Sequence, residues 1–221
     1  MGDDMQMSEI VLRLLVKLFV LVAILPLHEF AHGWMAKKMG DRTAQMLGRL
    51  TLNPIKHLDY IGALCMLVVG FGWAKPVPIN PENFKWKNKK LATALVAFAG
   101  PASNLIAAFV GCFIWELLTF APFSIEVFET LSIVFSCFVS INIGLAIFNL
   151  LPIPPLDGSK ILYIFLPDRW IYQIESYSQY IMLGLFALMY LTNIDSFIWL
   201  VGDIVFRWMI GIINAFLGLF V

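Results

Sequence analysis

The residues best suited to chemistry in this sequence form the motif His28-Glu29-Phe30-Ala31-His32. Positions four apart share one face of an α-helix, so both imidazoles can reach one metal ion, and Glu29 stands beside them. Neutral imidazole suits Zn²⁺, and a catalytic zinc holds three protein ligands and a water whose pKa falls toward about 7. A neighbouring glutamate can accept that water's proton. The motif therefore predicts one zinc ion bound by His28 and His32, with Glu29 as the base.

A chance spacing of two core histidines is the alternative interpretation of this motif. Imidazole and carboxylate groups are costly inside an apolar span and usually mark function there. Pro26, just upstream, frees a backbone carbonyl of the same helix. The chain has three histidines, and two of them are in this motif. These features favour a metal site.

The segments that must hold the motif have the composition of a membrane protein. The 221 residues are 60% hydrophobic and 14% charged, with a mean hydropathy of +0.83. Soluble domains have about 45–50% apolar and about 25% charged residues. The formal net charge of zero argues against nucleic-acid binding. The three cysteines lie in apolar runs and indicate neither a disulfide framework nor a thiolate metal site.

Five stretches are apolar enough to cross about 30 Å of hydrocarbon as helices. They are residues 7–36, 91–120, 128–151, 177–191 and 197–221, and a shorter apolar run covers 57–72. The N-terminus is acidic and has no small-residue cleavage site, so we expect the first span to remain in the mature protein.

The charges of the loops predict an orientation in the membrane. Ten Lys and Arg residues lie between the first two strong spans, whereas the loop 121–127 has Glu126 and no basic residue. The positive-inside rule places the basic region in the cytosol. Basic residues flank the 57–72 run on both sides, so we expect it to be re-entrant from the cytosolic face. The prediction is a multi-pass protein of the cell membrane with its active site toward the cytosol.

A third metal ligand is needed. It must lie at the same depth in the membrane as His28 and His32, near the cytosolic side, and this requirement limits the candidates. Glu116 and Asp195 fall near the outer ends of spans, Asp203 is four residues from Arg207 as in a helical ion pair, and His57 and Asp59 have interfacial neighbours. Asp157 follows a span that descends to the cytosolic side, and Gly158 permits close backbone approach. Because Asp-Gly also forms turns, spacing alone leaves Asp157 as either a ligand or a turn residue.

Two motifs together carry a family resemblance. The HEFAH motif in the first span, with NLLPIPPLDG at 149–158, resembles the site-2 protease family of intramembrane zinc metalloproteases. The sequence GPASN at 100–104 and the stretches 48–54 and 72–80 are similar to the short bacterial and archaeal members, which lack PDZ and CBS domains.

The resemblance implies roles for individual residues. His28, His32 and Asp157 would be the ligands of one catalytic Zn²⁺, and Glu29 would be the catalytic acid/base. Asn149 would contact the substrate or the reacting carbonyl. Asn104, like Asn142, is read from its apolar span as an interhelical hydrogen-bonding residue.

Residues 75–80 (Lys-Pro-Val-Pro-Ile-Asn) have the pattern of an extended segment with one blocked edge. Alternate residues of an extended chain direct their backbone groups to opposite sides. Pro76 and Pro78 lack N–H groups on one side, whereas Val77 and Ile79 keep theirs on the other. A substrate could add as a strand to that second side, which would replace the hydrogen bonds of its own helix. A rigid proline turn in a cytosolic loop is the alternative.

The predicted architecture is a single integral-membrane protease domain over residues 1–221, with a core at 7–160 and additional C-terminal helices at 177–221. We expect an all-α protein with about five to six transmembrane helices, and a re-entrant or extended membrane-associated segment between the first two strong spans.

The predicted function is that of a zinc metalloendopeptidase that hydrolyses peptide bonds in or near transmembrane segments, as in regulated intramembrane proteolysis. Its partners would be membrane-spanning protein substrates and the lipid bilayer, and the oligomeric state stays open. A divalent-metal transporter and a catalytically silent client-binding membrane protein are the alternatives. A transporter has no need for a glutamate between the two histidines.

Overall fold

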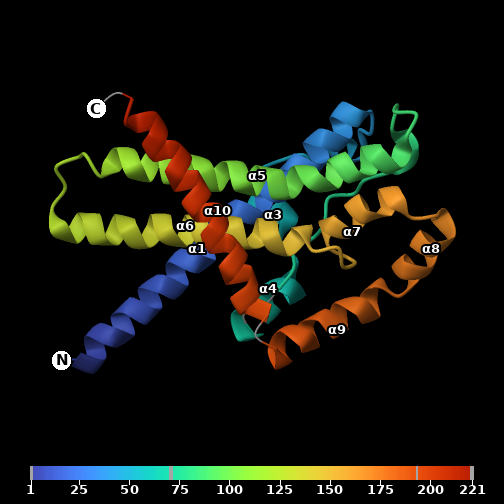
Figure 1. The fold of residues 1–221 in the computed structure, drawn as a ribbon. Helices are drawn as coiled ribbons and strands as arrows, with labels where there is room; N and C mark the ends of the chain where they lie inside the picture. The colour runs from blue at the N-terminus through green and yellow to red at the C-terminus, as the bar shows by residue number, and fades with distance from the viewer. Residues whose placement is uncertain (1, 70–71, 193, 220–221) are drawn as a thin grey trace.

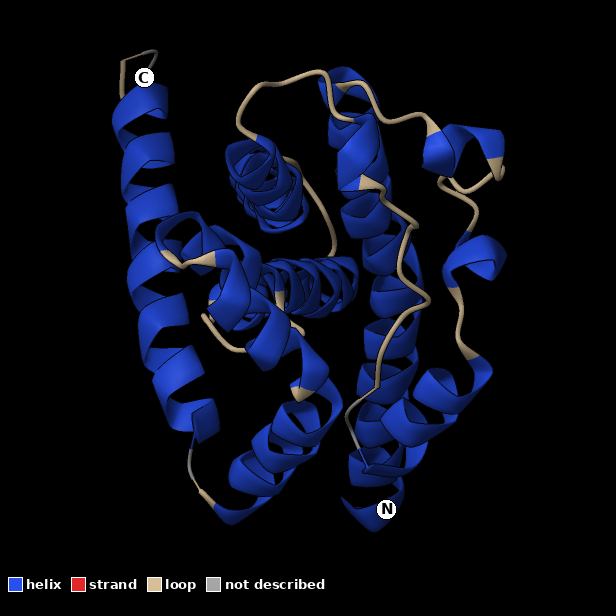
Figure 2. Ribbon diagram, turned by 90° about the vertical axis from the view of Figure 1, so that its right-hand side faces the viewer, coloured by secondary structure: helices blue, strands red, loops and turns tan. Residues whose placement is uncertain are grey.

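A computed structural model describes residues 2–69, 72–192 and 194–219. Over these ranges the chain forms helices and loops and contains no β-strand, which confirms the all-α prediction (Figure 2). In chain order the elements are α1 (Gly2–Met39), α2 (Thr43–Met46), α3 (Pro54–His57), α4 (Tyr60–Val69), the 3₁₀ helix η1 (Pro81–Asn83), α5 (Lys89–Leu118), α6 (Ile125–Leu150), α7 (Asp157–Leu162), the 3₁₀ helix η2 (Tyr163–Phe165), α8 (Asp168–Ser176), α9 (Ser178–Leu191) and α10 (Ile194–Leu217).

Helices α5 and α6 run side by side in opposite directions, and α10 crosses them (Figure 1). The side chain of Asn88 caps α5 by accepting a hydrogen bond from the N–H of Leu91 at 3.1 Å. Gly111 lets the two helices approach closely, because a Cβ there would lie 2.9 Å from the ring of Phe138 on α6. The buried side chains shared by the three helices are Ala108, Cys112, Val139, Ile143, Met209 and Ile213.

Helix α1 packs its C-terminal part against α5 and thereby buries the HEFAH motif. It is one continuous helix of 38 residues that contains Pro26. A second cluster of buried side chains joins it to α5 and the preceding loop: Ala36, Met39, Phe84, Ala92 and Val96. His28 and His32 are therefore enclosed between helices and are only 5% and 6% exposed.

The segment predicted to be re-entrant contains the end of α3 and all of α4. Helix α4 has 10 residues, about 15 Å of helix and half the thickness of the hydrocarbon. The chain then returns along it, because a Cβ on Gly62 would lie 2.1 Å from the carbonyl oxygen of Trp73. Residues 70–71 lie outside the described ranges.

Three described helices are long and apolar enough to cross a membrane: Lys89–Leu118, Ile125–Leu150 and Ser196–Leu217. They correspond to three of the five predicted spans. The predicted span 7–36 falls within α1, and 177–191 corresponds to α9, whose apolar run Ser178–Met189 is shorter. The count of five to six spans is therefore not confirmed.

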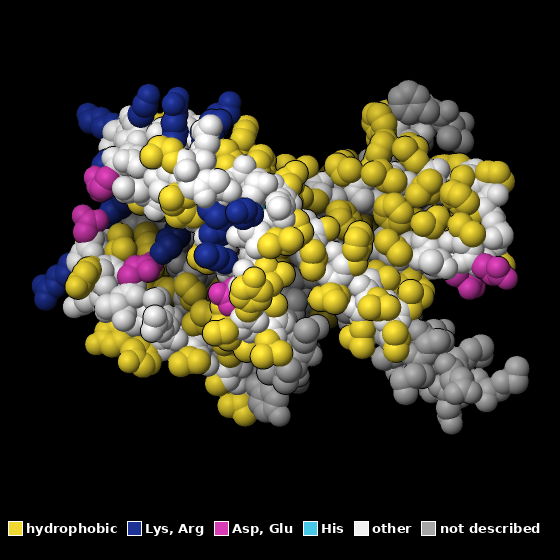
Figure 3. Space-filling view, turned by 180° about the vertical axis from the view of Figure 1, so that it is seen from behind, with side chains coloured by type: hydrophobic (Ala, Val, Ile, Leu, Met, Phe, Trp, Pro, Cys, Tyr) yellow, Lys and Arg dark blue, Asp and Glu magenta, His cyan; other side chains and the backbone are white. Residues whose placement is uncertain are grey.

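Charge is distributed unevenly along the molecule (Figure 3). On the face shown, Lys and Arg side chains gather at one end, and apolar side chains cover much of the remaining surface. The basic end is the one where α5 begins and α6 ends (Figure 1). The two ends of the helix pair therefore differ in polarity.

Candidate metal centre

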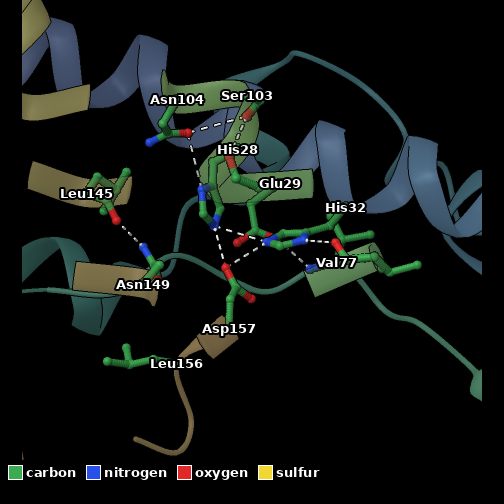
Figure 4. A network of polar contacts seen from close by, with 12 residues as sticks. His28, Glu29, His32, Val77, Ser103, Asn104, Leu145, Asn149, Leu156 and Asp157 are labelled. Carbon is green, nitrogen blue, oxygen red and sulfur yellow. Dashed lines mark hydrogen bonds and ion pairs between the residues drawn. The ribbon is translucent and has the colours of Figure 1, made fainter. Parts of the chain in front are cut away.

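Three side chains from two distant parts of the chain converge on one point (Figure 4). His28 and His32 come from successive turns of α1, and Asp157 is the first residue of α7. The Nε2 atoms of the histidines are 3.0 Å apart, and each lies 3.2 Å from Oδ2 of Asp157. The Asp157 carboxylate points at the imidazoles and makes no turn-type bond to the described backbone. The structure thus groups the three predicted ligands and argues against the turn interpretation.

Helix α5 fixes which nitrogen of each imidazole faces this point. Nδ1 of His32 donates to the backbone oxygen of Val96 at 2.8 Å, and Nδ1 of His28 donates to Oδ1 of Asn104 at 3.2 Å. A carbonyl oxygen can only accept, so the proton of each neutral ring is on Nδ1. Both Nε2 atoms then present lone pairs to the centre, as metal-ligating histidines do.

Two glycines provide the space that the centre needs. A Cβ on Gly100 would lie 2.3 Å from Nε2 of His32 and 2.7 Å from Cε1 of His28. A Cβ on Gly158 would lie 2.2 Å from the carbonyl oxygen of Leu150, so this glycine allows α7 to begin against the end of α6. The close approach predicted at Gly158 is confirmed.

The donor set fits a zinc ion. Two imidazole lone pairs and a carboxylate oxygen face one another, and the buried Asp157 Oδ2 has no hydrogen-bond donor among the described residues. With zinc–ligand bonds of roughly 2.0–2.2 Å, ligand atoms around a tetrahedral ion lie about 3.3–3.6 Å apart. The observed separations of 3.0–3.2 Å lie just below that range.

Glu29 has a main-chain partner that the sequence did not predict. Its Oε2 accepts a hydrogen bond of 2.7 Å from the N–H of Val77. Residues 75–80 form neither helix nor strand, and the backbone of Asn80 is extended. The Val77 N–H is occupied and not free. The prediction of a free donor at this residue is wrong because it considered only the segment and not the carboxylate beside it.

Two further charged side chains hold the same segment. Nη2 of Arg49 donates to the carbonyl oxygens of Lys75 at 2.8 Å and of Pro76 at 3.2 Å. Asp41 is 1% exposed, and its Oδ2 accepts from the N–H of Asn80 at 2.7 Å. The segment is therefore bound at both ends as well as at Val77.

Burial raises the pKa of Asp41, but its hydrogen bonds lower this pKa more strongly and leave it below the ordinary value of 3.8. The donors are the hydroxyl and N–H of Thr43, the N–H of Asn80 and the side-chain amide of Asn83. Asp41 therefore joins the end of α1 to the extended segment as an ionised group at neutral pH.

The remaining predicted residues lie as follows. Asn149, on α6, is near the centre, and its side-chain amide donates to the carbonyl oxygen of Leu145 at 2.9 Å (Figure 4). His57 is buried rather than interfacial, and its Nε2 donates to the carbonyl oxygen of Thr51. Asp203 pairs with Arg207 at 2.7 Å, which confirms the predicted helical ion pair.

The two buried asparagines have different roles. Asn104 does bond between helices, but its partner is a histidine of the metal centre. Asn142 instead donates within its own helix to the carbonyl oxygen of Phe138, so its predicted interhelical bond is wrong.

Comparison with known proteins gives the family. A model described as "Peptidase family M50" matches residues 16–125 and 121–191 of this chain. The chain belongs to peptidase family M50. It is 45% identical over 172 residues to "Putative zinc metalloprotease YwhC" of Bacillus subtilis (strain 168), which covers 76% of this chain and 78% of that relative.

Two relatives of lower identity are longer. The chain is 31% identical over 137 residues to "Putative zinc metalloprotease Rip2" of Mycolicibacterium smegmatis, and 32% identical over 134 residues to Rip2 of Mycobacterium tuberculosis (strain Erdman). These matches cover 60% of this chain and 50% of each relative. The chain thus spans about half the length of the Rip2 proteins. No solved structure matches it.

Membership of M50 makes this chain an intramembrane zinc metalloprotease of the site-2 protease type, as the sequence predicted. Sequence reasoning missed four contributors to the site: Asp41, Arg49, Gly100 and Asn104. Three of them fall in stretches that carried the resemblance, 48–54 and 100–104. Their spacing from the HEFAH motif gave no indication that they approach it.

Proposed function

We propose that His28, His32 and Asp157 hold the catalytic zinc, and that Glu29 is the acid/base of peptide hydrolysis. The observation that carries this proposal is the convergence of three acceptor atoms with Glu29 in the next position of the same helix. A bound zinc ion supplies a Lewis acid and lowers the pKa of a water molecule.

In this scheme the side chains of the protein orient the zinc ligands and transfer the proton. Asn104 and the Val96 carbonyl keep both imidazoles in the ligating tautomer. Glu29 takes a proton from the attacking water and delivers it to the amide nitrogen as the peptide bond breaks, so one product gains a carboxylate and the other an amine. Asn149 contacts the substrate from α6.

We further propose that the extended residues Pro76, Val77, Pro78 and Ile79 bind the substrate by strand addition. A helical transmembrane segment has its carbonyls hydrogen-bonded internally, and an extended partner can replace those bonds. The segment is supported in this role by its bond to Glu29, which places it beside the reacting groups.

We also propose a multi-pass topology in the cell membrane. A basic end and an apolar remainder fit a multi-pass protein of the cell membrane whose basic end faces the cytosol (Figure 3). Gly100 lies eleven residues beyond Lys89 in α5, so the centre is about 16 Å along the helix from that end. The return of the chain at Gly62 and Trp73 supports a re-entrant α4.

Replacing Glu29 with Gln tests the proposed mechanism. We expect Glu29→Gln to retain one zinc per chain and to lose cleavage of a co-purified single-span protein by at least about 10³-fold. Glu116→Gln, a glutamate of α5 outside the centre, is the matched control and should cleave normally. Cleavage by the Glu29→Gln protein would overturn the assignment. Metal flux into proteoliposomes that is unchanged in this variant would favour a transporter.

A further inference from the structure

We propose that Val77 and Ile79, although they share one edge of the extended segment, have different tasks. The N–H of Val77 positions Glu29, and the substrate pairs with the carbonyl of Val77 and with both backbone groups of Ile79. This inference rests on the proposed strand addition and specifies where the strand binds.

The alternation of backbone groups places the two residues on the same edge. Residues two apart in an extended chain direct their N–H and C=O groups to the same side. Val77 directs its N–H to Glu29, whereas the N–H of Asn80, three residues on, is bonded by Asp41. Different carboxylates thus bind the two edges, and the edge of Val77 and Ile79 is the one that faces Glu29.

The Val77 N–H is unsuited to binding a substrate. It is held at 2.7 Å by a carboxylate, and hydrogen bonds to charged acceptors are about twice as strong as neutral ones. A substrate carbonyl would have to displace the catalytic carboxylate in order to use this donor. The bond instead makes Val77 a positioning residue for Glu29.

The neighbouring groups on the same edge are free. Among the described residues, none bonds to the carbonyl of Val77 or to the N–H and carbonyl of Ile79. Along this edge, within the part of the chain that the structure describes, the Val77 carbonyl is an unpaired acceptor, the Ile79 N–H is an unpaired donor, and the Ile79 carbonyl is a second unpaired acceptor. An antiparallel strand would pair both its backbone groups with Ile79, and a parallel strand would bridge Val77 and Ile79.

The side chains of Val77 and Ile79 pack against α1 and its neighbours. A Cβ on Gly33 of α1 would lie 3.2 Å from Cγ1 of Val77, so this side chain packs directly on the α1 backbone. Ile79 packs against the cluster that joins α1 and α5. Arg49 fixes the start of the segment through the Lys75 and Pro76 carbonyls.

Proline variants with alanine controls test the division of tasks. Proline removes the N–H at either position, whereas alanine removes the side chain and keeps the N–H. The probe is a fluorescent Leu/Ala-rich transmembrane peptide with a central Asn-Gly-Ser break, in detergent micelles. Its Kd is measured by anisotropy in the Glu29→Gln background, and its kcat and KM are measured with Glu29 present, at matched zinc content.

We expect Ile79→Pro to raise Kd about tenfold relative to Ile79→Ala. Val77→Pro should keep Kd within about twofold of Val77→Ala but lower kcat about 100-fold, because Glu29 loses its orienting donor. An equal rise of Kd in both proline variants would refute the division of tasks while leaving strand addition intact. Normal kcat in Val77→Pro would refute the positioning role.

Failure of the underlying proposal has a different signature. If neither proline variant changes Kd, or if the probe does not bind the Glu29→Gln protein, strand addition at this segment is wrong. Amide exchange covers the case in which a proline variant fails to fold. In Glu29→Gln protein we expect fast exchange at Ile79 that slows when the probe is added; an Ile79 amide that is already protected without the probe would overturn the inference.

Discussion

Gly100 of α5 lies directly against the imidazole of His32, since a Cβ at Gly100 would be 2.3 Å from Nε2. The positions of the two proposed metal-binding histidines therefore depend on a missing side chain in another helix. The contact also explains why the GPASN sequence belongs to the site although none of its residues is a proposed ligand.

Gly100→Ala should expel the metal. The added methyl group overlaps His32 Nε2 and the His28 ring, both of which are buried and cannot move aside freely. We expect zinc content to fall below a tenth of one ion per chain, with helicity retained. Gly144→Ala on α6 is the control, because a Cβ there meets nothing within 4 Å. Full zinc occupancy in Gly100→Ala would contradict the geometry of the centre.

Asn104→Ala should weaken zinc binding without removing a proposed ligand. The substitution deletes the acceptor of His28 Nδ1, and loss of such a partner lowers metal affinity by about 10–100-fold. Competition with a chelator measures the change. The control is Asn142→Ala, which removes another fully buried asparagine whose bond stays within α6. Equal affinities in the two variants would show that Asn104 does not support His28.

Arg49→Gln should reduce catalysis through the extended segment. The variant loses the donor to the Lys75 and Pro76 carbonyls, so the segment that orients Glu29 is less fixed. We expect about a tenfold lower kcat and a loss of about 1–3 kcal/mol in the free energy of unfolding, with zinc retained. Arg49→Lys should recover part of both. Arg42→Gln, at an exposed arginine, is the control; a similar loss there would indicate a general charge effect.

Acid should destabilise the protein through Asp41. The pKa of this group is lower in the folded chain than its ordinary value of 3.8. The contribution of ionised Asp41 to the free energy of unfolding is therefore fully present above pH 3.8. This contribution is lost as pH falls through the folded-state pKa. We expect the free energy of unfolding in detergent to decrease over this acidic range, and Asp41→Asn to show a lower and flatter profile. An identical slope in Asp41→Asn would assign the acid sensitivity to other carboxylates.

The sequence by itself determined the fold class and the ligand types. Apolar runs of membrane length predicted helices, and the spacing within HEFAH predicted two imidazole ligands on one helix face. These inferences succeed because they depend on local quantities. Hydrophobicity over one helix length and the rise between His28 and His32 need no knowledge of other elements.

Only the tertiary structure decided how the centre is oriented and supported. Asn104, Val96 and Gly100 act on α1 from α5, and Val77 meets Glu29 from a loop 48 residues away. From its spacing, Asp157 could be either a turn residue or a metal ligand. The packing of α7 against the end of α6 brings its carboxylate to His28. Such contacts depend on how helices cross, and helix crossing is set by packing over whole surfaces, which no local spacing encodes.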